Sequence, residues 1–362
     1  MVRLGDVCKK ASSNIAQKDL EEHSGKYPIY GASGLIKHVD FYQQEQPYIA
    51  VVKDGAGIGR VMKLPAKSSV IGTMQYIIPN DTVDISYLAY AMEYMNLSKY
   101  FSGATIPHIY FKDYQKETLP LPPLDEQRCI AATLDKVSDL ISKRRQQLDK
   151  LDELVKARFV EMFGDKDYPY KELISLIKDG AGLSYGIVQP GEDGSGNMGV
   201  LRPVDLVNGK IDTTSIKYID RSLGEGFKKT ELNGNELLIS VRGTTGITAL
   251  TDDRFVGMNV TRGIAVIRYD NEKINPVYLN TYLKTDESQR YIREHTRGAT
   301  LQQINLSDLR VQQILVPPRD EQEQFSTFVE QTEKTKATIS HSLEKLETLK
   351  KALMQEYFGT QI

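Results

Sequence analysis

The amino-acid sequence predicts the α+β fold class, with two tandem α+β domains joined by two long helices. Two observations carry this prediction: a proline-rich motif is written twice, and each copy precedes a long charged stretch with apolar residues at coiled-coil spacing. The expected order is a domain at residues 1–120, a helix at 121–165, a domain at 166–315 and a helix at 316–362. Paired as an antiparallel coiled coil, the helices would make the chain a pseudo-two-fold dumbbell.

The repeat extends beyond the motif itself. The two copies read LPLPPLDEQ at 119–127 and VPPRDEQ at 316–322, and an offset of 195 residues carries Pro122 onto Pro317. The same offset relates two further pairs of short stretches: Gly103-Ala104-Thr105 with Gly298-Ala299-Thr300, and Phe163-Gly164 with Phe358-Gly359. These gap-free matches indicate a two-unit tandem array in which each unit is a globular part followed by one helix.

Each motif is typical of a strand end followed by a helix start. Proline lacks an N–H and disfavours helix at the residue before it, so the Pro-Pro pair ends the strand. We expect Asp125 and Asp320 to accept hydrogen bonds from the first unpaired N–H groups of the helix, where their charge also suits the helix dipole. Paired acids can also serve general acid–base catalysis, but a helix start explains these residues without it. A Phe-Gly pair is expected to end each helix.

The two helical stretches have the heptad spacing of a coiled coil. The apolar seam of the first comprises Ile130, Leu134, Val137, Ile141, Leu148, Leu151 and Val155, with Arg144 in one slot. The apolar seam of the second comprises Phe325, Val329, Ile339, Leu343, Leu346 and Leu353, interrupted by Thr332, Lys336 and Lys350. The three polar residues are expected to weaken the pairing, or to mark places where partner helices pack. An antiparallel pair is favoured because a parallel pair would require the second domain to span the whole helix length.

Both globular parts are predicted to mix strands and helices. In the first, strands are expected at 48–52, 59–64 and 75–79, with a helix at 84–101 that begins with an Asp cap. In the second, strands are expected at 236–241 and 263–268, and an Asn-Pro pair begins a helix at 275–293. In each unit the helix leads into a Gly-Ala-Thr loop, a strand and then the proline motif.

Composition bounds the class of protein. The chain has 362 residues, 40% hydrophobic and 26% charged, and a formal net charge of −2, so basic residues that bind nucleic acid would have to gather on one face. Cys8 and Cys129 make neither a disulfide framework nor a metal-ligand spacing. The sequence contains no apolar run of signal-peptide or transmembrane length. We therefore expect a cytoplasmic protein.

Several motifs of catalysis or cofactor binding fail on their context. The stretch 194–199 matches G-x-G-x-x-G but follows a polar loop rather than a strand, and the Gly-rich stretch 55–59 lies between two strands, as in a hairpin. The five histidines have no metal-ligand spacing. There is no phosphate-binding G-x-x-x-x-G-K-[ST] and no nucleophile elbow. We expect no cofactor, no metal and no catalytic residue in this chain.

The chain resembles the specificity (S) subunit of Type I restriction–modification systems, with two target recognition domains and two conserved spacer helices. The resemblance rests on LPLPPLDEQ (119–127), VPPRDEQ (316–322), KLDELVKARFVEMFG (150–164), KLETLKKALMQEYFG (345–359) and the two Gly-Ala-Thr loops. It implies a non-catalytic DNA reader in which each recognition domain reads one half of a bipartite, asymmetric target. It further implies that the helices set the spacer and dock two methyltransferase subunits, which carry S-adenosylmethionine, with ATP/Mg on endonuclease subunits where these are present.

Loop residues able to contact bases or phosphates are the candidate DNA-binding residues. In the first domain these are Tyr30, Ser33, Lys37, Lys53, Arg60, Thr73, Gln75, Thr105, His108 and Tyr110. In the second domain they are Ser184, Tyr185, Lys229, Arg242, Thr244, Thr245, Asn259, Arg262, Arg297, Thr300, Gln302 and Gln303. Loops that recur in both units, 53–57 against 242–246 and the two Gly-Ala-Thr loops, are the stronger candidates, whereas an isolated Lys or Arg is more often a solvated surface charge.

Two other classes of function remain open at this point. One is a fusion that carries its own methyltransferase, which would bind S-adenosylmethionine; the missing catalytic motifs argue against it. The other is a coiled-coil scaffold without a nucleic-acid role, which salt-dependent binding to duplex DNA would exclude.

Overall fold

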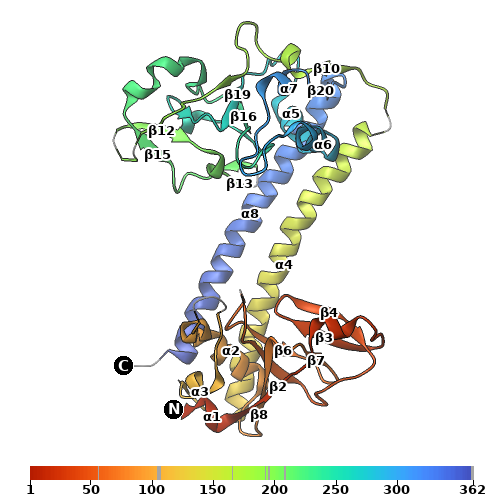
Figure 1. Ribbon diagram of the computed structural model, residues 1–362, viewed down its shortest axis with the longest axis vertical. Helices are drawn as coiled ribbons and strands as arrows, with labels where there is room; N and C mark the ends of the chain where they lie inside the picture. Colours follow the sequence, from red (N-terminus) through yellow and green to blue (C-terminus); the bar gives the residue numbers. More distant parts are fainter. Residues whose placement is uncertain are drawn as a thin grey trace. The chain divides into compact units, whose positions relative to one another are not determined.

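The computed structural model describes residues 1–55, 57–103, 107–164, 166–191, 193–194, 196–207 and 209–359. The chain forms two compact units, Met1–Gln147 with Ile339–Ile362, and Leu148–Thr338. Each unit therefore contains one α+β domain and parts of the two long helices α4 (Leu124–Phe163) and α8 (Arg319–Phe358), which Figure 1 shows as unbroken ribbons.

The domain of the first unit consists of short strands and helices that precede α4. In chain order they are β1 (Val2–Arg3), α1 (Leu4–Val7), β2 (Cys8–Ser12), η1 (Gln17–Leu20), β3 (Tyr27–Gly31), β4 (Gly34–Val39), β5 (Tyr48–Val52), β6 (Val61–Leu64), β7 (Ser69–Val70), β8 (Met74–Pro79), α2 (Ile85–Tyr94), η2 (Leu97–Tyr100), α3 (Phe111–Tyr114) and β9 (Thr118–Leu119).

The domain of the second unit lies between α4 and α8 in the sequence. Its elements are β10 (Tyr170–Glu172), η3 (Leu173–Leu176), β11 (Ser184–Tyr185), β12 (Met198–Leu201), η4 (Pro203–Asp205), β13 (Leu206–Val207), β14 (Lys210–Ile211), β15 (Lys217–Ile219), η5 (Arg221–Thr230), β16 (Leu237–Ser240), β17 (Thr248–Leu250), η6 (Asp253–Phe255), β18 (Asn259–Val260), β19 (Ile264–Ile267), α5 (Pro276–Tyr282), α6 (Asp286–His295), α7 (Leu306–Arg310) and β20 (Gln313–Leu315).

The two domains share the strand order of their main sheets, and the second domain adds the antiparallel pair β13-β14. The four-stranded sheet has the order β2-β8-β5-β6 in the first domain and β11-β19-β16-β17 in the second. The three-stranded sheets, β4-β3-β7 and β15-β12-β18, each combine one antiparallel and one parallel pairing. A two-stranded ladder, β1-β9 or β10-β20, joins the start of each domain to the strand before the proline motif. The predicted duplication of an α+β domain is therefore confirmed at the level of strand order.

The predicted strands are all present, but both predicted helices are interrupted. The helix expected at 84–101 ends as α2 at Tyr94, because Asn96 adopts a left-handed φ of +50° before the separate turn η2. The helix expected at 275–293 divides into α5 and α6, and the Thr285 hydroxyl caps the second of these. Apolar periodicity continues across both breaks, which is why the sequence pattern did not reveal them.

The glutamine of the proline motif, rather than its aspartate, joins each long helix to its domain. Gln127 is buried; its Oε1 accepts from the Asp84 N–H at 2.8 Å and its Nε2 donates to Pro122 O at 2.8 Å and Thr82 O at 3.2 Å. Gln322 repeats this, accepting from the Asn275 N–H and donating to Pro317 O, both at 2.8 Å.

The expected capping role of the two aspartates is wrong. Asp125 lies within the first turn of α4, and its exposed carboxylate accepts from Arg128 Nη1 at 3.3 Å. Asp320 likewise lies in the first turn of α8. Both remain favourably placed for the helix dipole.

Parts of α4 and α8 run antiparallel within each unit. In the first unit, Arg145 Nη2 lies 2.6 Å from Glu347 Oε1, and Leu134 shares a core with Met354 farther along. In the second, Lys336 Nζ lies 2.7 Å from Asp152 Oδ1, and the rings of Phe159 and Phe325 are 5.5 Å apart. Residue numbers rise along α4 while those of the contacted residues in α8 fall, as the sequence predicts.

The polar residues on the α8 seam have partners inside the chain. Lys336 bonds Asp152 and Glu333, both at 2.7 Å. Lys350 bonds Glu93 at 2.9 Å and lies over the Tyr90 ring. The Thr332 hydroxyl donates to Phe328 O at 2.9 Å. Of the three, Lys336 contacts α4 through Asp152, whereas Lys350 contacts α2 and Thr332 bonds its own helix.

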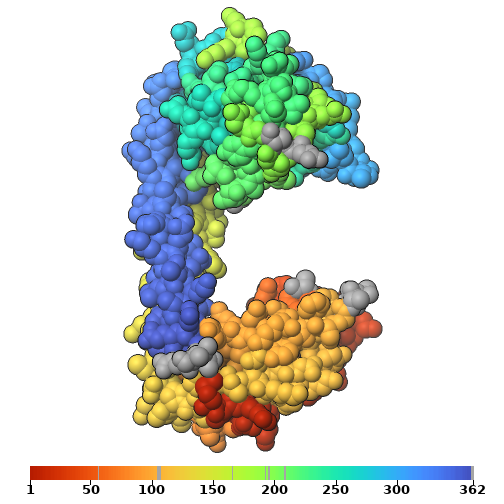
Figure 2. Space-filling model, turned by 90° about the vertical axis from the view of Figure 1, so that its left-hand side faces the viewer, coloured from red at the N-terminus to blue at the C-terminus, as the bar shows by residue number. Residues whose placement is uncertain are grey.

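Each long helix ends in the aromatic core of a domain. Phe163 at the end of α4 is buried among Phe159, Tyr278 and Phe325 of the second unit. Phe358 at the end of α8 packs on Tyr87 of the first unit, where Figure 2 shows the blue end of α8 against orange and yellow residues. Gly164 and Gly359 follow the two helices, both at ordinary φ. A Cβ would lie 2.7 Å from Val160 O at the first and 2.3 Å from Gln355 O at the second, so each position favours a glycine.

Candidate nucleic-acid interface

In the first domain, the loop after β5 crosses the loop that precedes α3. The Ile109 N–H donates to Lys53 O at 3.0 Å, and the Gly55 N–H donates to Pro107 O at 3.1 Å. The backbones of Ser102 and His108 exchange two hydrogen bonds of 2.8 and 2.9 Å, which hold these two residues side by side. We call this arrangement the first loop crossing.

The second domain contains the same crossing after β16. The Ile304 N–H donates to Val241 O at 3.0 Å, and the Gly243 N–H donates to Gln302 O at 2.9 Å. Arg297 and Gln303 exchange two backbone hydrogen bonds of 2.8 Å. This second loop crossing repeats each backbone hydrogen bond of the first. In each domain, the same two loops therefore meet at the equivalent position.

Glycines allow both crossings to form. Gly55 and Gly243 have φ of +85° and +84°, and Gly103 and Gly298 have φ of +101° and +103°. Residues with a Cβ rarely adopt these values, so a glycine is favoured at each of these turns. Within each domain, backbone hydrogen bonds thus join the two recurring loop regions that the sequence analysis identified.

The side chains at the crossings differ between the domains. In the first, the Asp54 carboxylate bonds His108 Nδ1, and the Tyr110 ring lies 4.2 Å from the His108 ring. In the second, Arg242 and Gln303 form the equivalent backbone bridge, and the hydroxyls of Thr245 and Thr296 lie 3.1 Å apart. One backbone frame thus carries an acid–imidazole pair in one domain and a cation with an amide in the other.

The structure corrects the pairing of the first recurring loop. The sequence comparison sets 53–57 against 242–246, and so Lys53 against Arg242, but the hydrogen bonds match Lys53 with Val241 and Asp54 with Arg242. Asp54 was consequently missed as a site residue. The available indicator was the glycine that follows, since Asp54-Gly55 and Arg242-Gly243 each stand after a buried strand.

The other candidates of the first domain occupy three kinds of place. Ser33, Thr73 and Tyr110 are exposed. Tyr30 is half-buried on β3, packed against the core of the four-stranded sheet. Lys37 donates to Leu20 O at 2.7 Å, and Arg60 donates to Ala32 O at 2.6 Å, so both cations hold neighbouring segments in place. Thr105 lies outside the described residues.

Most candidates of the second domain are accessible. The exposed ones are Tyr185, Lys229, Thr244, Arg262, Arg297, Thr300 and Gln302, while Ser184, Arg242, Thr245 and Gln303 are half-buried. Arg297 stands 3.7 Å from Asp308 Oδ2, an oxygen that is buried without a hydrogen-bond partner. Ser184 and Tyr185 form β11 at the edge of the four-stranded sheet, apart from the second loop crossing.

Two predicted DNA-reading residues are wrong because both side chains are buried. Gln75 is 4% exposed and donates to the hydroxyl of Tyr114, whose pKa burial raises well above its ordinary value. Asn259 is 1% exposed; its Oδ1 accepts from the Thr230 hydroxyl and its Nδ2 donates to Phe227 O. Both amides satisfy buried groups of the fold and cannot reach a base edge.

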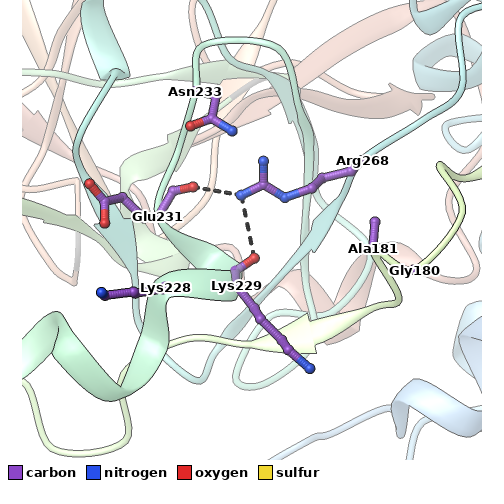
Figure 3. Close-up of a pocket in the computed structure, with 7 residues that line it drawn as sticks. All are labelled: Gly180, Ala181, Lys228, Lys229, Glu231, Asn233 and Arg268. Carbon is purple, nitrogen blue, oxygen red and sulfur yellow. Dashed lines mark hydrogen bonds between the residues drawn. The ribbon is translucent and has the colours of Figure 1, made fainter.

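Lys229 lines a shallow, polar surface hollow with Lys228. Figure 3 shows both lysine side chains pointing away from Arg268, which donates to Glu231 O at 2.6 Å and to Lys229 O at 3.4 Å. Arg268 also bonds the buried Glu236 at 3.0 Å. The Arg268 guanidinium therefore links neighbouring segments of the domain, and the two lysines supply the accessible positive charge of the hollow.

Neither metal ligation nor membrane insertion is indicated by the part of the chain that the structure describes. Its His, Cys, Asp and Glu side chains form no group of three or more that could hold a metal ion. None of its helices combines the length and the apolar character needed to cross a bilayer.

The chain belongs to the family of Type I restriction modification DNA specificity domains, whose model matches residues 1–152 and 193–348. It is similar to the EcoBI specificity subunit of Escherichia coli, at 23% identity over 72% of this chain and 62% of the relative. It is also similar to the MjaIX specificity subunit of Methanocaldococcus jannaschii, at 24% identity over 70% of this chain and 63% of the relative. The chain thus spans just over three fifths of these curated relatives.

Solved structures share the fold over the whole chain. The S subunit of a Type I restriction–modification system from M. genitalium superposes with a TM-score of 0.61, covering 100% of this chain and 96% of that one at 14% identity. A chain from a study of Type I restriction–modification complex assembly gives a TM-score of 0.54 at 16% identity and the same full coverage of this chain. The predicted α+β fold with two repeated domains and long helices is confirmed.

Proposed function

We propose that this chain is the DNA-sequence specificity subunit of a Type I restriction–modification complex and is not itself catalytic. The observation that carries the proposal is the pair of loop crossings, in which one backbone frame presents Asp54 and His108 in one domain but Arg242 and Gln303 in the other. Equal scaffolds with unequal hydrogen-bonding side chains suit a protein that reads two different short sequences.

The proposed division of labour follows the repeat. Residues 1–120 and 166–315 each read one half of a bipartite, asymmetric duplex. The helices at 121–165 and 316–362 set the unread spacer and dock two methyltransferase subunits, which bring S-adenosylmethionine. ATP/Mg belongs to endonuclease subunits where the complex has them. Exposed cations such as Arg262, Lys228 and Lys229 contact phosphates, and side chains at the loop crossings contact base edges.

Domain exchange tests the proposal most directly. Residues 166–315 are replaced by the matching domain of a relative with a different target, and methylated sites are mapped in cells that express the chimaera with its methyltransferase partner. We expect one half of the methylated sequence to change and the other to stay. If both halves change together, or if the unaltered chain directs no methylation, the proposal is wrong.

Helix length tests the proposed role of the spacer helices. One heptad inserted after Gln147 and another after Ser342 keep both seams in register and lengthen each helix by about 10 Å. At roughly 3.4 Å per base pair, the unread spacer should grow by at most about three base pairs while both half-sites stay the same. The added DNA twist can lower activity. Full activity on an unchanged spacer would show that the helices do not measure distance.

A further inference from the structure

We propose that Asp54 determines specificity in the first half-site by positioning His108, whose free ring edge reads one base. The inference rests on the proposed function and adds the residues and the chemistry of one readout position. It is carried by the hydrogen bond between the Asp54 carboxylate and His108 Nδ1 at the first loop crossing.

The geometry holds the imidazole in one orientation. The backbone of Asp54 bridges that of His108, so both residues have fixed Cα positions. The carboxylate then binds Nδ1, and the Tyr110 ring covers one side of the imidazole at 4.2 Å between centroids. The His108 side chain is 27% exposed, so part of its ring still reaches solvent. A partly exposed ring held at three places is suited to reading rather than to core packing.

The chemistry of the free ring nitrogen follows from this bond. When Nδ1–H donates to a carboxylate, Nε2 of the neutral ring is an acceptor. In the major groove the exocyclic amines of adenine and cytosine are the donors that such an acceptor can recognise. The carboxylate therefore selects the tautomer that presents an acceptor, and the expected base at this position carries an amine.

The charge of Asp54 fits this role better than a direct phosphate contact. A carboxylate close to DNA repels phosphates, and here its second oxygen lies 4.0 Å from Lys53 Nζ. Lys53 thus offsets part of the repulsion. Removing the carboxylate should accordingly leave non-specific DNA affinity unchanged or higher while base discrimination falls.

The scaffold itself does not need an aspartate at this position. Backbone bonds from Ile109 to Lys53 and from Gly55 to Pro107 close the crossing without help from the carboxylate. The second domain forms the same crossing with Arg242 in the place of Asp54 and Gln303 in the place of His108. A side chain that the frame tolerates as either acid or cation is free to serve recognition.

The test compares Asp54→Ala, Asp54→Asn and His108→Ala in the full chain with its methyltransferase partner. Methylation is mapped in cells, and binding to target and to scrambled duplexes is measured over a salt series. For Asp54→Ala we expect discrimination at one base pair of the first half-site to fall about 10-fold, within the range for loss of a base contact. Non-specific binding should stay equal or rise. Asp54→Asn, whose amide oxygen can still accept from Nδ1–H, should recover most of the loss.

A double mutant separates positioning from independent action. Because Asp54 acts through His108, the double variant Asp54→Ala/His108→Ala should discriminate no worse than His108→Ala alone. Asp40→Asn is the matched control, since Asp40 bonds His23 Nδ1 at 2.8 Å in the same domain but outside the first loop crossing. It should leave the methylated sequence unchanged.

Three results would overturn the inference. In each of them the unaltered chain still directs methylation, so failure of the inference is distinguished from failure of the proposed function. The first is an Asp54→Ala variant with unaltered discrimination. The second is a parallel loss of specific and non-specific binding, as expected if Asp54 only supports the fold. The third is a change in the second half-site. If Asp54→Ala does not fold, the other two variants still decide. His108→Ala must then lose discrimination at one base pair of the first half-site, and Asp54→Asn must keep most of it.

Discussion

The two domains of this chain differ far more at their loop crossings than in their frames. Both have the same strand order and the same backbone hydrogen bonds where the two loops meet. In the first domain the loop from Val52 to Gly59 is one residue longer than its counterpart from Ser240 to Gly246, judged by the backbone bonds that close each loop. Main-chain hydrogen bonds therefore determine the backbone of each loop crossing, and the side chains there can differ between the two domains.

The helix ends provide the largest expected contrast. The ring of Phe163 contacts four aromatic rings, whereas that of Phe358 contacts two, Tyr87 and Tyr94. Phe163→Ala should destabilise the second unit by about 3–5 kcal/mol, and Phe358→Ala should cost the first unit an amount near the lower end of that range. Hydrogen exchange followed peptide by peptide measures each unit separately. Equal losses in both units after either substitution would show that the units do not unfold independently.

The buried glutamines of the proline motifs provide the next contrast. Gln127 makes three hydrogen bonds to the main chain and Gln322 makes two. Replacement by Leu leaves buried N–H and C=O groups unpaired, so Gln127→Leu should cost about 2–3 kcal/mol and Gln322→Leu somewhat less. Hydrogen exchange at the start of α2 and of α5 reports the loss. Gln146→Leu and Gln331→Leu, at exposed positions of α4 and α8, are the controls and should stay within about 0.5 kcal/mol.

The cations next to the crossings test which of them read bases. Arg242 occupies the position of the second loop crossing that is equivalent to Asp54, whereas Lys53 is the residue before Asp54 in the first. Arg242→Ala should cost about 1–3 kcal/mol and relax specificity at one base pair of the second half-site. Lys53→Ala should weaken all sequences alike and reduce the salt dependence of binding. Binding to a panel of single-base variants of the target distinguishes the two outcomes, and unchanged affinity with unchanged specificity would make both residues plain surface charges.

The smallest expected effect concerns the glutamate of the motif. Hydrogen bonds from Lys166 and then Tyr168 lower the pKa of Glu321 below its ordinary value. A carboxylate with a lowered folded-state pKa stabilises the fold above its ordinary pKa, and this contribution disappears as pH falls through the folded-state value. Glu321→Gln should therefore destabilise the second unit slightly at neutral pH and not at all in strong acid. Denaturation across pH checks this, with the exposed repeat equivalent Glu126→Gln as the control.

Local pattern was sufficient to predict the repeat, the two long helices and the main strands. Heptad spacing specifies a helix seam and short apolar runs specify buried strands, because both depend on neighbours within one element. The three-stranded sheets were not predicted, since their short strands such as β7 and β18 are defined only by parallel pairing with distant segments. The breaks after α2 and α5 escaped for a related reason, because apolar spacing continued across them.

The candidate site was predicted in outline and resolved only by tertiary structure. Glycine-rich loops recurring in both halves identified the region, since a glycine that permits left-handed φ is visible in sequence. Gln75 and Asn259 are no longer candidates because their side chains are buried against hydroxyl groups. The sequence could not show this, since an amide is the same residue whether it faces a base or a buried hydroxyl. The pairing of Asp54 with His108 joins residues 54 positions apart. Such a bond is decided by where the folded main chain places two loops, and no local pattern encodes that distance.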